Sequence, residues 1–134
     1  MLCFVLFYFL HKLFMDSYTQ LEAWKVGLDL VSEIYVLTKK FPKEELYGLT
    51  AQARRAATSI LLNIAEGFGR YTYPDKASKY TIARGECHEV EACLFIAIRL
   101  DYITFEETKK AFHLIEREQK LLSGLISSCR KRAA

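Results

Sequence analysis

Side chains able to do chemistry gather in one stretch, residues 52–70, which reads QARRAATSILLNIAEGFGR. Arg54 and Arg55 adjoin in an alanine-rich setting, and Asn63 and Glu66 follow among apolar neighbours. Because a buried polar group without a partner costs about 1 to 3 kcal/mol, Asn63 and Glu66 are expected to tie down the end of a helix and its loop. The two arginines either pair with carboxylates of a neighbouring helix or bind a ligand, and the sequence leaves both alternatives open.

The acids available for such pairing are Glu86, Glu89 and Glu91. Gly67 is placed to end the helix in the left-handed conformation that glycine adopts readily. The residues to which we assign a structural polar or capping role are Asn63, Glu66, Gly67 and Glu89.

Cations and aromatic rings are interleaved in the connector that follows, residues 70–79. This combination suits nucleic acid, since Lys and Arg attract phosphates and tyrosine rings stack on unpaired bases. We expect the candidates to cluster around the end of the second long helix and the start of the third. The candidate nucleic-acid-binding residues are Arg54, Arg55, Arg70, Tyr71, Tyr73, Lys76, Lys79 and Arg84. A second basic patch, Arg130 to Arg132, lies at the chain end, where charge runs are usually solvated.

Several catalytic designs do not fit the sequence. None of the three histidines, His11, His88 and His113, has a glutamate three residues before it, as a carboxylate-bridged di-iron bundle requires. No phosphate-binding GxxxxGK motif is present. Arg84 and His88 hint at a helical nuclease, but a solvated or inter-subunit face is the favoured interpretation. We therefore expect no enzyme activity, no metal, no cofactor and no small-molecule substrate.

The composition is that of one globular domain. The 134 residues are 51% hydrophobic and 26% charged, and 19 Lys and Arg against 16 Asp and Glu give a net charge of +3. This mild charge permits contact with nucleic acid without demanding it. The four cysteines form no CxxC pair, and we interpret Cys87, Cys93 and Cys129 as packing residues of a protein in the reducing cytoplasm.

The first fifteen residues differ from the rest, because every residue from Leu2 to Leu10 is apolar. The run is shorter than the roughly 20 residues of a membrane span, and it has no basic residues before it, as a signal peptide would. Two alternatives remain: an extension upstream of a natural start at Met15, which we favour, or a membrane-associating tail. Ser17 and Gln20 match a helix capping box. We divide the chain into an extension, residues 1–15, and a folded domain, residues 16–134.

Apolar residues recur at spacings of three and four through four later segments, which predicts four amphipathic helices and no sheet. Pro42 and Pro74 mark two of the joints, and Thr104 with Glu107 forms a second capping box. Short joints favour an antiparallel up-down-up-down four-helix bundle. The stripe expected for the first of these helices is Leu21, Trp24, Leu28, Val31, Tyr35 and Thr38, and that for the third is Tyr80, Ala83, Cys87, Val90, Leu94 and Ala97.

The order of the polar and glycine positions resembles a known family. The matching motifs are LxxW at 21–24, FP at 41–42, ExYGL at 45–49, QxRRA at 52–56, NIAEG at 63–67 and IARG at 82–85. Together they resemble the four-helix-bundle proteins encoded in intervening sequences of bacterial 23S rRNA genes, which include relatives that accompany diversity-generating retroelements. The chain departs from the family in Glu86, where a serine is usual, and in Asp101, where a glycine is common.

The resemblance implies a left-handed four-helix bundle that assembles into a ring-like homopentamer and binds structured RNA or DNA. A ring multiplies the charge of each chain, so +3 per subunit becomes a substantial positive surface. We therefore expect a non-catalytic, oligomeric, cytoplasmic nucleic-acid-binding protein with no integral membrane span. The alternative is a scaffold module that docks a protein partner such as a reverse transcriptase.

Overall fold

The computed structural model describes residues 1–15 and 17–134, and residue 16, where the sequence places the start of the folded domain, lies outside the described residues. The described part is all helical and contains no strand. In chain order the elements are α1 (Leu2–Met15), η1 (Tyr18–Gln20), α2 (Glu22–Thr38), η2 (Lys43–Glu45), α3 (Leu49–Gly69), α4 (Tyr73–Arg99) and α5 (Phe105–Ala133), where η denotes a short 3-10 helix.

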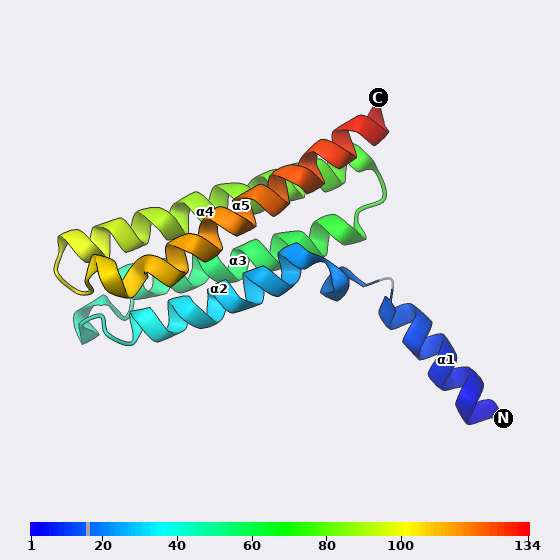
Figure 1. The fold of residues 1–134 in the computed structure, drawn as a ribbon, viewed down its shortest axis with the longest axis horizontal. Helices are drawn as coiled ribbons and strands as arrows, with labels where there is room; N and C mark the ends of the chain where they lie inside the picture. The colour runs from blue at the N-terminus through cyan, green and yellow to red at the C-terminus, as the bar shows by residue number, and fades with distance from the viewer. Residues whose placement is uncertain (16) are drawn as a thin grey trace.

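Four long helices pack into a bundle, and α1 extends away from it (Figure 1). Helix α3 packs against α2 and α4, and α5 packs against the other sides of the same two helices. The four contacts close a ring around one apolar core. Among the described residues, no helix is both long enough and apolar enough to cross a bilayer.

The core confirms the stripe predicted for the third helix of the bundle, because all six of its residues are buried on α4. The stripe predicted for α2 is partly wrong: Leu28 and Tyr35 are 46% and 41% exposed. The buried apolar residues of α2 are Ala23, Val26, Leu30, Ile34 and Leu37. Apolar residues occur on more than one side of this helix, so the spacing of three and four fits two stripes, and packing against α3 and α5 selects one of them.

Helix starts show which of the two predicted capping boxes forms. Thr104 and Glu107 cap each other's backbone N–H groups at the start of α5, as predicted. Ser17 instead accepts a hydrogen bond from the Thr19 N–H at 3.3 Å and caps only η1. The capping box predicted with Gln20 is therefore wrong, since Leu21 is extended and α2 begins at Glu22.

Gly67 does not have the left-handed conformation predicted for it. Helix α3 continues to Gly69, and none of the described glycines has a positive φ. A Cβ on Gly67 would lie 2.8 Å from Cε1 of Tyr80 and 3.0 Å from Cβ of Lys79, so glycine here allows α3 and α4 to approach closely. The left-handed residue is Asp101, with a φ of 60°, in the turn between α4 and α5.

Candidate nucleic-acid interface

The connector and the C-terminal tail, which lie far apart in the sequence, meet at one end of the bundle. The end of α5 lies beside the start of α4 (Figure 1), and Cζ of Arg132 is 5.6 Å from the centroid of the Tyr73 ring. We call residues 66–79 and 130–132 together the basic end. Its six cations, Arg70, Lys76, Lys79, Arg130, Lys131 and Arg132, outnumber Glu66 and Asp75 and leave +4, more than the +3 of the whole chain.

Two tyrosines stand at the basic end where α4 begins. Thr72 accepts a hydrogen bond from the Asp75 N–H as the N-cap of α4, and Pro74 occupies the first turn, where its missing N–H costs nothing. This local chemistry fixes the helix start and leaves Tyr71 outside it. Tyr71 is 99% exposed and Tyr73 is 38% exposed. The ring of Tyr71 is therefore open to a stacking partner.

Part of the positive charge at the basic end is used within the subunit. Lys76 donates to the carbonyl oxygen of Phe68, one of the last carbonyls of α3. Arg70 and Lys79 both pair with Glu66, whose pKa is lowered first by the hydrogen bond from Arg70 and then by that from Lys79. One carboxylate is thus shared by two cations, so a net positive charge remains.

Three of the predicted candidates lie away from this end. Arg54 and Arg55 are 16 and 15 positions before Arg70, which corresponds to roughly 22 to 24 Å along a helix. Nε of Arg54 donates to Oγ1 of Thr38 at 2.9 Å, and its guanidinium lies 4.5 Å from the centroid of the Tyr35 ring. The cluster predicted from the sequence is therefore divided, with Arg54 bound to α2.

Arg55 on α3 forms ion pairs with acidic residues of α4. It pairs with Glu86 at 3.4 Å and with Glu89, and its hydrogen bond is the main cause of the lowered pKa of Glu89. Two positions before Glu86 on α4, Nη1 of Arg84 donates to Oγ of Ser123 on α5 at 3.3 Å. Asn63 keeps its amide within α3, where Nδ2 donates to the carbonyl oxygen of Ser59 at 2.9 Å. These side chains connect helices or turns of the bundle.

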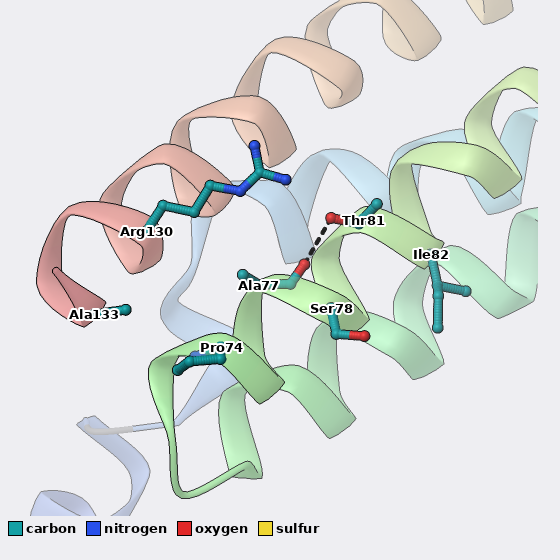
Figure 2. Close-up of a pocket in the computed structure, with 7 residues that line it drawn as sticks. All are labelled: Pro74, Ala77, Ser78, Thr81, Ile82, Arg130 and Ala133. Carbon is teal, nitrogen blue, oxygen red and sulfur yellow. Dashed lines mark hydrogen bonds between the residues drawn. The ribbon is translucent and has the colours of Figure 1, made fainter.

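A shallow hollow adjoins the basic end between α4 and α5. Its volume is about 460 Å³, and Figure 2 shows Arg130 reaching over it from α5 toward the first turns of α4. The lining residues are Pro74, Ala77, Ser78, Thr81, Ile82, Arg130 and Ala133. The lining residues other than Ile82 and Arg130 have small side chains. The guanidinium of Arg130 therefore lies beside a surface with few protruding side chains.

One buried acidic residue was not predicted from the sequence. Glu118 is fully buried in α5, and neither carboxylate oxygen has a hydrogen-bond partner among the described residues. Its position three residues after Ile115 and four before Leu122 places it on the same face of the helix as these two buried residues, so the spacing alone was sufficient to find it. In the described part of the chain, no group of His, Cys, Asp or Glu side chains is arranged to hold a metal ion.

The fold and the basic end define a class of protein: an all-helical bundle with cations concentrated where α3, α4 and α5 end or begin. The chain belongs to the 23S rRNA-intervening sequence protein family, whose sequence profile matches residues 19–124. A solved structure from Bacteroides thetaiotaomicron, described as a protein of unknown function from the S23 ribosomal protein family, is 28% identical with a TM-score of 0.71. The match covers 78% of this chain and 97% of that one. No curated protein matches the chain.

Proposed function

We propose that this protein is a non-catalytic, oligomeric nucleic-acid-binding protein of the cytoplasm that contacts structured RNA or DNA through the basic end. The contact of Arg132 with the Tyr73 ring carries the proposal, because it joins the tail and the connector into one surface. The proposal includes an antiparallel, left-handed up-down-up-down bundle, which the ring of helix contacts supports. It also includes a homopentamer, in which the +4 of each basic end is repeated around a ring.

The chemistry of binding follows from the two kinds of side chain at the basic end. Its cations replace counterions along a phosphate backbone, which makes affinity fall steeply with salt. The exposed ring of Tyr71 stacks on a base that is not paired, a contact worth about 1 to 3 kcal/mol. A stem with an unpaired loop offers both partners, so it is the ligand class that this surface fits.

The test is a titration of a labelled RNA stem–loop over a series of salt concentrations. We compare the wild type with the triple variant Arg130→Ala, Lys131→Ala and Arg132→Ala. Each lost phosphate contact lowers the salt slope by about 0.7 to 0.9, so the slope falls by about two to three if all three contacts form. Tyr71→Ala weakens binding and leaves the salt slope unchanged, because it removes a stacking contact and no charge.

A charge-matched control comes from the opposite end of the bundle. Lys39, Lys43 and Arg99 are exposed cations near the ends of α2 and α4 that lie away from the basic end. Changing these three to Ala removes the same charge, and we expect the RNA affinity to fall far less than in the tail variant. Equal losses in the two triple variants would show that only net charge matters and would refute a defined interface.

A second candidate function is a scaffold that docks a protein partner. It is favoured by a hollow of about 360 Å³ between α2 and α3, where Tyr35 and Leu62 are 41% and 63% exposed beside Arg54. This function predicts that Leu62→Gln abolishes capture of a defined partner while RNA affinity is unchanged. The RNA titration separates the two functions, because a scaffold alone gives no binding of the stem–loop at low salt.

A further inference from the structure

Over residues 2–10, helix α1 presents apolar side chains in every direction. Leu2, Phe4, Val5, Leu6, Phe7, Tyr8, Phe9 and Leu10 are each 58% to 84% exposed. Successive helical residues are about 100° apart, so these positions go around the whole circumference more than once. A groove on a protein covers one side of a helix, whereas a helix that is apolar all round requires an apolar medium on all sides.

The length of α1 defines the geometry of such a medium. Fourteen residues at about 1.5 Å each give roughly 21 Å, which is less than the roughly 30 Å of a bilayer core. The helix is therefore too short to span a bilayer core, but it can lie within one leaflet.

Helix α1 joins the bundle close to the positive charge of the basic end. The chain enters the bundle through η1, where the Tyr18 ring lies 4.7 Å from the Trp24 ring and 6.4 Å from the Phe68 ring, measured between centroids. Phe68 is also the residue whose carbonyl accepts the hydrogen bond from Lys76. The apolar helix is thus connected to the bundle at the basic end. An anionic lipid surface complements both features, since stable membrane binding generally needs an apolar insertion together with a second signal such as a basic patch.

We propose that α1 inserts into one leaflet of an anionic bilayer and that the basic end of the bundle then lies against the lipid headgroups. The inference does not depend on nucleic-acid binding. It does have a consequence for it, because phospholipid headgroups and RNA phosphates use the same cations. Anionic vesicles and the RNA stem–loop therefore compete for the protein.

The experiment is co-sedimentation of the full chain with two kinds of vesicle, one of phosphatidylcholine alone and one of equal parts phosphatidylcholine and phosphatidylserine. We expect measurable binding to the first and stronger binding to the second, with added salt removing only the difference. Changing Phe4, Leu6 and Phe9 to Gln keeps the chain length and leaves the protein in the supernatant with both vesicles. The tail variant Arg130→Ala, Lys131→Ala and Arg132→Ala binds phosphatidylcholine as the wild type does and loses up to about 100-fold of its affinity for the anionic vesicles.

A matched control changes three exposed apolar side chains of the bundle, Leu46, Leu62 and Phe95, to Gln. This variant removes similar apolar surface, and we expect its binding to vesicles to equal that of the wild type. Unchanged binding by the α1 variant, or equal binding of the wild type to both vesicles, would overturn the proposal. Sedimentation of the wild type without vesicles would also overturn it, because other copies of the chain would then cover α1. These outcomes are independent of the RNA titration, which is measured without lipid.

Discussion

Glu118 gives a prediction whose size can be worked out from its surroundings. The side chain is fully buried in α5, and no hydrogen bond within the described residues reaches its carboxylate. Toward α2 it faces Gly27, where a Cβ would lie 3.5 Å from Oε1. Burial raises its pKa from 4.5 to about 8, and the nearby charge of Arg117 only partly opposes this shift. The folded protein therefore holds a proton that the unfolded chain releases at much lower pH.

The sign of the pH dependence follows from this difference. Below pH 4.5 the carboxyl is protonated in both states, so its titration does not penalise folding. Between pH 4.5 and about 8 only the folded state binds the proton, so the free energy of unfolding falls as the pH rises. The expected slope is about 1.4 kcal/mol per pH unit, which amounts to about 3 kcal/mol between pH 5 and pH 7.

The assay is urea unfolding, followed by circular dichroism at one protein concentration, at several pH values between 5 and 8. Glu118→Gln keeps the shape and cannot ionise, so its stability should change with pH by about 1.4 kcal/mol per unit less than that of the wild type. Glu118→Leu should show the same weaker dependence and be more stable than Glu118→Gln, because an apolar side chain leaves no buried polar atom unsatisfied.

The control for this experiment is Glu116→Gln on the same helix. Glu116 is 64% exposed, and its hydrogen bond with Lys120 lowers its pKa, so it stays ionised throughout the pH range of the assay. The wild-type slope should therefore persist in this variant. Parallel stability curves for the wild type and Glu118→Gln would refute the reasoning, since they would mean that Glu118 binds no extra proton on folding.

Two further predictions concern the backbone, and both are measured as shifts in the urea midpoint at constant slope. Gly67→Ala should lower the stability by about 1 to 3 kcal/mol, because the added Cβ would overlap the Tyr80 ring. Gly85→Ala should raise the stability by up to about 1 kcal/mol, because a Cβ at this position has no atom within 4 Å and alanine favours the helix. Asp101→Gly should raise the stability by up to about 1 kcal/mol and Asp101→Val should lower it, because only glycine is unstrained at a φ of 60°. Equal effects of the two alanine substitutions, or a destabilising Asp101→Gly, would contradict these assignments.

Features that depend on a few neighbouring residues were predictable. The four long helices of the bundle follow from the spacing of apolar residues, and the capping box of Thr104 and Glu107 forms as its pattern predicts. The start of α2 was not predictable from its own capping pattern. Ser17 binds the nearer N–H of Thr19, while the Tyr18 ring packs on Trp24 and Phe68, a contact that involves another helix.

The candidate site was predicted only in part, because the partners of a long cationic side chain lie on other helices. Arg55 pairs with Glu86 and Glu89 on a neighbouring helix, which is one of the two alternatives that the sequence left open. Arg54 instead contacts Thr38 and the Tyr35 ring. Nothing in the local sequence distinguishes these adjacent arginines. Their directions differ by about 100° around α3, so each reaches a different neighbouring helix.

By itself, the sequence determined the all-helical class, the four long helices of the bundle and the family, since these depend on short-range spacing and on the order of motifs along the chain. Only the tertiary structure decided which face of α2 is buried, why residue 67 must be glycine, and that Glu118 has no partner within the described chain. It also brought Arg132 to Tyr73 although 58 residues lie between them in the chain. The physical reason is that packing of the helices, which involves every core residue at once, determines which surfaces become neighbours.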